Sequence, residues 1–315
     1  MSLTLDELDE HCRAILSCRL IKNRIIILCE GSIEKAEGRL LPHLYGKMEQ
    51  MPDANFYRAC LPRKWRAYRP KFFNCGGRTT TIATYFRLLE LHEEDPVHSY
   101  LTPEKLYAIV DLDLQVQEIA DYDFSDTEEI FSDLYNQSRV NAKNADKHRI
   151  WVTGLIHKEA YFLIPELQDV FDNLLNPPMY KDKPLNLDRV YMDMAEAIAT
   201  DTDLCDNWTR ACDRVRHCAT LDSTKCETLR DSWKTCFQTA SRPEKLELIR
   251  ALLTIQKAKN YWNQVEPPDD YSLTDTVFRD DAMLRIAEWY SNCGKDNRHH
   301  IPFLLGMLYE REFTA

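Results

Sequence analysis

The chain has 315 residues, of which 44% are hydrophobic, and its formal net charge is −11. This length and composition are typical of a globular protein with one large or two ordinary domains, and they exclude a disordered chain. No apolar run reaches the roughly 20 residues that span a bilayer, and the acidic start MSLTLDELDEHCR lacks a signal-peptide pattern, so we expect a cytoplasmic protein with no membrane contact.

The first half of the chain alternates between strand and helix patterns. The pattern predicts a helix over residues 5–20, a buried strand over 23–29, a helix over 33–47, strands with a loop over 55–77, a helix after the glycine turn 76–77, a buried strand over 106–112, a helix over 125–137 and a further strand within 148–165. This alternation predicts an α/β fold with a mostly parallel sheet flanked by helices.

The character of the sequence changes after Pro165, where strand patterns fade and helix patterns continue. We therefore predict two domains, 1–165 with the sheet and 166–315 as an all-helical C-terminal region for dimerisation or partner docking. Five cysteines of this region are spaced wrongly for a zinc site, and we interpret them as reduced thiols buried on helices. They are Cys205, Cys212, Cys218, Cys226 and Cys236.

Acidic residues stand where the predicted strands end. Glu30 follows the apolar run IIILC, and Asp111 and Asp113 follow LYAIV. Glu159 lies just past the strand within 148–165, and Glu34 is four residues after Glu30. Ligands of parallel sheets gather beyond the carboxyl ends of the strands, and clustered carboxylates are usually stabilised by a divalent cation. The alternative is that each of these acids is an ordinary solvated residue.

A basic segment interrupts this acidic chain, because no Asp or Glu occurs from Ala54 to Leu89. Its arginines and lysines are candidates for phosphate binding, and Trp65 or Tyr68 for stacking on bases. The alternative is a solvated edge strand whose arginine stems lie along apolar surface. The candidate nucleic-acid-binding residues are Arg63, Lys64, Arg66, Arg69, Lys71 and Arg78.

Four motifs together resemble the Toprim family. LCEGSIE resembles its first motif at Glu30, in the form of the OLD-like branch with a further acid at Glu34. AIVDLDLQ resembles the second motif at Asp111 and Asp113. FNCGGRTTTI resembles the intervening glycine turn, and LIHKEAYFLIP a later acidic motif at Glu159. The resemblance covers about residues 23–165 and implies a Toprim-like sheet.

The resemblance implies an Mg²⁺-dependent endonuclease, with Mn²⁺ able to replace Mg²⁺. Glu30, Glu34, Asp111 and Asp113 would hold metal, with Glu159 as a further catalytic acid.

No Walker A pattern is present, so the ATPase half of an OLD protein is missing. A Toprim domain followed by helices is similar to the AriB family, the effectors of the PARIS anti-phage system, which implies an ATPase partner and a tRNA substrate. We also expect a homodimer. RNA and DNA both remain open, and the competing hypothesis is a catalytically inactive Toprim-like module that regulates or docks a partner.

Overall fold

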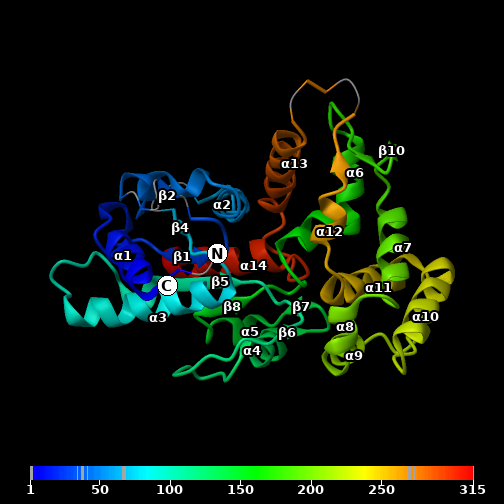
Figure 1. Cartoon of the computed structure of the whole chain (residues 1–315), viewed down its shortest axis with the longest axis horizontal. Helices are drawn as coiled ribbons and strands as arrows, with labels where there is room; N and C mark the ends of the chain where they lie inside the picture. The colour runs from blue at the N-terminus through cyan, green and yellow to red at the C-terminus, as the bar shows by residue number, and fades with distance from the viewer. Residues whose placement is uncertain are drawn as a thin grey trace.

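A four-stranded sheet lies at the centre of the N-terminal half of the computed structural model (Figure 1), which describes residues 3–33, 35–36, 39–40, 42–65, 69–268, 271–272 and 274–314. The strand order is β4-β1-β5-β8, and all neighbouring strands run parallel. The strands are β1 (Ile26–Cys29), β4 (Lys71–Asn74), β5 (Leu106–Val110) and β8 (Ile150–Val152). They are almost wholly buried, as expected for a parallel sheet covered on both faces. The predicted α/β class is confirmed.

Each face of the sheet packs against its own helices. On one face, Leu28 and Val110 share a hydrophobic core with Ile15 of α1 and Leu88 of α3. These two helices contact each other along their length and lie together in Figure 1. They span Leu5–Leu16 and Arg78–Glu94, and both agree with predicted helices.

The other face is covered by segments far apart in the sequence. Ile27 and Ile109 share a second core with Phe56 of α2 (Ala54–Ala59) and Leu305 of α14 (His300–Thr314). The indole of Trp65 packs edge-on against the ring of Tyr309, with centroids 5.6 Å apart. This core continues across residue 165 into the C-terminal helices, and the division into domains 1–165 and 166–315 stays a prediction.

The region after Pro165 is mostly helical, as predicted, and also contains a small antiparallel sheet in the order β10-β9-β11 that the all-helical prediction missed. Helices α7 to α11 lie on the side of the molecule away from α1 and α3 (Figure 1). The elements are α6 (Gln168–Asp172), β9 (Met179–Tyr180), β10 (Lys183–Pro184), α7 (Leu187–Ala197), α8 (Thr202–Asp206), α9 (Trp208–Val215), α10 (Cys226–Thr239), α11 (Arg242–Ile255), α12 (Lys259–Trp262), β11 (Val265–Glu266) and α13 (Asp275–Tyr290).

Short elements complete the N-terminal half. They are β2 (Lys35–Ala36), β3 (Arg39–Leu40), α4 (Thr127–Leu134), β6 (Tyr135–Asn136), β7 (Arg139–Val140), α5 (Ala142–Ala145) and 3₁₀ turns at Arg19–Ile21, Pro42–Gln50, Pro103–Lys105, Lys158–Leu163 and Pro165–Leu167. None of the described helices is long and apolar enough to cross a membrane.

Three local predictions were wrong. The helix expected over 33–47 is replaced, in its described part, by β2, β3 and a 3₁₀ turn, because Pro42 would lack a donor and clash inside a helix. The start of segment 55–77 is helical in α2, where strand and loop were expected. The five cysteines between 205 and 236 are not buried, since Cys205 is exposed and the other four are half-buried.

Candidate active site

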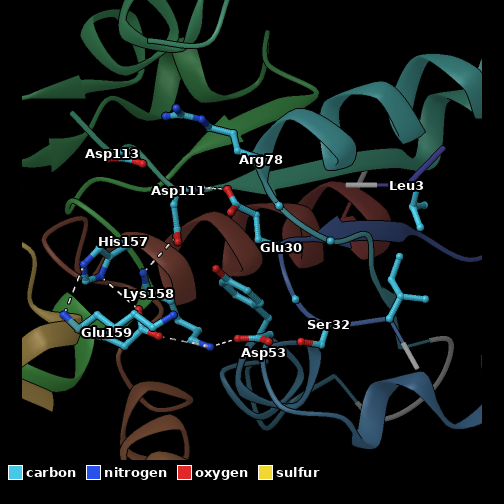
Figure 2. A pocket seen from close by; sticks show the side chains of 16 residues that line it. Leu3, Glu30, Ser32, Asp53, Arg78, Asp111, Asp113, His157, Lys158 and Glu159 are labelled. Carbon is cyan, nitrogen blue, oxygen red and sulfur yellow. Dashed lines mark hydrogen bonds and ion pairs between the residues drawn. The ribbon is translucent and has the colours of Figure 1, made fainter. Parts of the chain in front are cut away.

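Two of the predicted acids lie side by side at the ends of neighbouring strands. Cys29 of β1 is paired with Ile109 of β5, so Glu30 and Asp111 leave the same edge of the sheet. The Glu30 Oε1 atom accepts a hydrogen bond of 2.7 Å from the backbone N–H of Asp111. Both residues line a cavity of about 710 Å³ (Figure 2). Glu30 and Asp111 therefore lie together in a cavity at the carboxyl ends of the strands.

The glycine of the Glu-Gly motif is required by a close backbone approach. Gly31 has a φ of 154°, and a Cβ atom there would lie 2.6 Å from Cγ of the buried Asn74. The backbone N–H of Gly31 donates to the carbonyl of Gly76, and the N–H of Gly76 donates back, each at 2.8 Å. The loop after β1 is thereby joined to the glycine turn before α3, and both loops form one wall of the cavity.

A buried lysine faces the acids. The Lys158 side chain is 12% exposed and its ammonium forms an ion pair with Asp53, the residue before α2. Its Nζ atom lies 3.9 Å from Oε1 of Glu159, and its backbone N–H donates to Oδ1 of Asp111 at 3.1 Å. Burial lowers the pKa of Lys158. A positive charge is thus already built into the cavity beside the predicted acids (Figure 2).

The acids of the cavity differ in how readily they ionise. Burial raises the pKa of Glu30, although the N–H of Asp111 opposes the shift. Burial, followed by repulsion from Glu30 and Glu159, raises the pKa of Asp111 well above its usual range. Burial also opposes ionisation of Glu159, but the hydrogen bond of His157 and the charge of Lys158 outweigh it and lower the Glu159 pKa to about 2. Added positive charge near Glu30 and Asp111 would be stabilised there.

Histidine 157 is held at both of its ring nitrogens. Its Nδ1 atom lies 3.1 Å from Oε2 of Glu159, and its Nε2 atom accepts from the backbone N–H of Lys259 at 3.4 Å. These two contacts hold the His157 ring at the wall of the cavity beside Glu159.

The third predicted acid, Asp113, lines the cavity but is turned onto its own loop. Its Oδ1 atom accepts from the backbone N–H of Leu114 at 2.7 Å, and its φ is 48°. Within the part of the chain that the structure describes, no group of three or more His, Cys, Asp or Glu side chains is arranged to hold a metal ion. The predicted ligand Glu34 lies outside the described residues.

Of the predicted phosphate-binding cations, Arg78 lines the cavity, and its Nη1 atom donates to the carbonyl of Leu112 at 3.0 Å. Arg63 and Lys64 form ion pairs with Glu288 and Glu310. Lys71 forms an ion pair with Glu49 at 2.6 Å. It is the first residue of β4, so it lies at the amino ends of the strands, whereas Glu30 lies at their carboxyl ends. These contacts leave the predicted role of the segment in nucleic-acid binding open.

The rest of the basic segment is divided between core and surface. Arg69 donates from Nε to the carbonyl of Trp65 at 2.8 Å, and with Arg58 and Arg63 it lines a second cavity of about 340 Å³. The proposed stacking role of Trp65 is wrong, because its side chain is completely buried against α14. Arg66 and Tyr68 lie outside the described residues.

Three charged residues of the cavity were missed by the sequence analysis, namely Asp53, Lys158 and Lys259. Lys158 stands directly before Glu159 in LIHKEAYFLIP, and the apolar residues around it were a signal that this lysine would be buried. Asp53 carries no comparable signal. Comparison with known proteins adds no name to this site: no family model, no curated protein and no solved structure matches the chain.

Proposed function

We propose that the protein is a divalent-cation-dependent nuclease that hydrolyses phosphodiester bonds at the carboxyl edge of its parallel sheet. One observation carries the proposal: Glu30 and Asp111 lie side by side in a cavity of about 710 Å³, where desolvation raises the pKa of both and repulsion from Glu30 raises that of Asp111 further. Such perturbed carboxylates in a cavity are typical of functional sites, and the same two residues carry the Toprim resemblance.

The donor chemistry of the cavity fits Mg²⁺ or Mn²⁺, which prefer carboxylate oxygens. Glu30 and Asp111 would hold the cation, with Asp113 contributing from the adjoining loop, and the earlier prediction of Glu34 as a ligand is retained. When bound, the cation would neutralise these carboxylates, acidify a water molecule and stabilise negative charge on the leaving oxygen.

The protein's own cations would bind the phosphate. Lys158 lines the cavity with a largely desolvated ammonium between Asp53 and Glu159, where its interaction with an anion is stronger than in water. Arg78 lines the same cavity from the start of α3. Glu159, ionised and fixed by His157, would keep Lys158 charged. These roles follow from the contacts of the chain and apply equally to an RNA and to a DNA substrate.

The substrate and partners are proposed from the resemblance. RNA such as tRNA is favoured over DNA, and the protein would act as an anti-phage effector that an ATPase partner holds inactive, with homodimerisation through the helical region. The proposals of Mg²⁺ dependence and of the metal-binding acids do not depend on which nucleic acid is cut or which partner is bound.

The alternative is a catalytically inactive module that docks a partner. It is favoured by two observations: no three acidic or other ligand side chains of the described residues already converge on one point, and Lys158 is paired with Asp53 rather than with Glu30. Such a module would bind neither Mg²⁺ nor Mn²⁺ through Glu30 and Asp111.

A nuclease assay distinguishes the two functions. The wild type, Glu30→Gln and Asp111→Asn would be incubated with tRNA, plasmid DNA and single strands, with Mg²⁺, with Mn²⁺ or with a chelator. Glu129→Gln is the control, because Glu129 is an exposed acid on α4 outside the cavity. We expect cleavage by the wild type and the control only with a cation, and none by the two site variants. Wild-type cleavage by Glu30→Gln would refute the site.

A further inference from the structure

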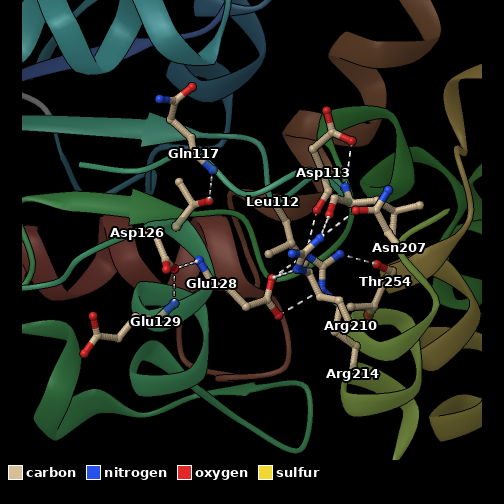
Figure 3. Close-up of polar contacts among 12 residues, drawn as sticks. Leu112, Asp113, Gln117, Asp126, Glu128, Glu129, Asn207, Arg210, Arg214 and Thr254 are labelled. Atoms are coloured by element: carbon tan, nitrogen blue, oxygen red, sulfur yellow. Dashed lines mark hydrogen bonds and ion pairs between the residues drawn. The ribbon is translucent and has the colours of Figure 1, made fainter. Parts of the chain in front are cut away.

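Three consecutive carbonyl groups follow Asp111, and each accepts a hydrogen bond from a different arginine. Arg78 donates to the carbonyl of Leu112 at 3.0 Å. Arg214 donates to the carbonyl of Asp113 at 2.6 Å, and Arg210 to that of Leu114. Figure 3 shows the last two arginines converging on this loop from α9. The loop that carries Asp113 is therefore held in part by the C-terminal helical region.

Arg214 is the centre of this arrangement. Its side chain is only 1% exposed, and its guanidinium forms two hydrogen bonds with Glu128 of α4, at 2.6 and 3.1 Å. Its Nη1 atom also donates to the carbonyl of Thr254 in α11 at 3.2 Å. One planar fork thus joins α4, α9, α11 and the Asp113 loop, a use for which arginine is suited and lysine is not.

The loop needs such support because its backbone is strained. Asp113 has a φ of 48°, a left-handed conformation that costs free energy for residues other than glycine and persists when surrounding contacts impose it. The N–H of Asp113 is fixed by the carbonyl of Ile156 at 2.8 Å, and its own carbonyl is fixed by Arg214. With both ends of the residue held, the direction in which its side chain leaves the backbone is set.

The contact with Glu128 indicates what kind of role Arg214 has. The carboxylate of Glu128 balances the charge of Arg214 within hydrogen-bonding distance, and Arg210 Nε lies 3.9 Å from the same carboxylate. Arg214 therefore orients the loop that carries Asp113 and adds little net positive charge near the acids.

We propose that Arg214, supported by Arg210, is a positioning residue that holds the backbone of Asp113 and Leu114, so that Asp113 stays at the cavity beside Asp111, where both would contribute to cation binding. This proposal rests on the proposed function. It assigns the C-terminal helical region a part in assembling the site, in addition to any role in dimerisation or docking. Loss of a residue that orients metal ligands typically weakens metal binding about tenfold to hundredfold.

The test compares two buried arginines in the full-length protein. Arg250 of α11 is 3% exposed and bonds to Glu166 at 3.1 Å, but it has no contact with the 111–114 loop among the described residues. Arg214→Met and Arg250→Met should lose comparable stability in urea. We expect only Arg214→Met to speed hydrogen exchange of the amides of residues 111–114 and to weaken Mn²⁺ binding, measured by calorimetry, about tenfold or more.

Two further variants separate geometry from charge and from misfolding. Arg214→Lys keeps the charge but not the fork, so it should behave like Arg214→Met in both measurements. Arg210→Met removes a half-buried arginine and should give a smaller change of the same kind. Equal effects of Arg214→Met and Arg250→Met, or full recovery in Arg214→Lys, would overturn the proposal. If the wild type neither binds Mn²⁺ nor cleaves nucleic acid, the proposed function fails, and the exchange data alone decide whether Arg214 orders the loop.

Discussion

Glu159→Gln should destabilise the protein although it removes a buried charge. Glu159 is 14% exposed and contacts both His157 and Lys158. Glutamine keeps the size of the side chain but loses the charge that these two partners stabilise. The perturbation therefore measures how strongly the folded state favours the ionised carboxylate.

The magnitude follows from the pKa of Glu159. It falls from an ordinary value of 4.5 to about 2 on folding, which at about 1.36 kcal/mol per pH unit gives about 3 kcal/mol of stability at pH 7. Because the folded pKa is lowered, this contribution is complete above pH 4.5 and is lost as the pH falls towards 2. Relief of repulsion on Asp111 acts in the opposite direction, so about 3 kcal/mol is an upper bound.

Urea unfolding followed by tryptophan fluorescence at pH 7 and pH 4 tests this reasoning. The free-energy cost of Glu159→Gln should be about 2–3 kcal/mol at pH 7 and smaller at pH 4. Glu93→Gln is the control, since Glu93 is exposed on α3 with no ion pair among the described residues, and should change stability by less than about 0.5 kcal/mol. A Glu159→Gln cost that grows as the pH falls, or a stabilisation at pH 7, would refute the assigned electrostatics.

Three other changes should give distinct results. Asp111→Asn should raise the urea midpoint at pH 7 and abolish cleavage. The pKa of Asp111 is higher in the folded state, so the protein loses stability above the pH at which this residue ionises in the unfolded chain. A lower midpoint would contradict this reasoning. Burial of His11 lowers its pKa from 6.5 to about 4, so the free energy of unfolding should fall as the pH drops from 6.5 towards 4. His11→Phe should reduce this pH dependence by up to about 1.4 kcal/mol per pH unit. An unchanged pH dependence would be inconsistent with a neutral buried His11. The Sγ atoms of Cys205 and Cys226 lie 2.9 Å apart, so excess hydrogen peroxide should oxidise them to a disulfide. Mass spectrometry should then find tryptic peptides 190–210 and 226–230 joined in the wild type but not in Cys205→Ser. No joined peptide in the wild type would argue against this proximity.

The positions of Glu30 and Asp111 were predictable because they depend on local patterns and one topological rule. Short apolar runs mark buried strands, and the ends of parallel strands meet at one edge of a sheet. The helix predicted over 33–47 is wrong in its described part, because Pro42 lies inside that range and cannot occupy a helix interior. The signal that places an acid after a strand is thus stronger than the signal that sets the end of a neighbouring helix.

The remaining features depend on partners that are distant in the sequence. Arg63 and Lys64 form exposed ion pairs with Glu288 and Glu310, which lie more than 200 residues further along the chain. Arg214 reads as one more charge on an amphipathic helix, and nothing near it in the sequence indicates that Asp113 is its partner. Trp65 in a basic segment resembles a stacking platform, yet α14 buries it. Tertiary packing decided each of these cases.

The hydrogen bonds of α9 to the carbonyls of Asp113 and Leu114 also bear on when the site can form. Contacts between segments far apart in the sequence must wait until both have been synthesised, and they slow folding. The Asp111 loop leaves the ribosome well before residues 208–215, so Arg210 and Arg214 are missing during that interval. Under the proposed nuclease function, a nascent chain would carry all the strand-end acids and yet be inert towards the messenger RNA to which it is still attached.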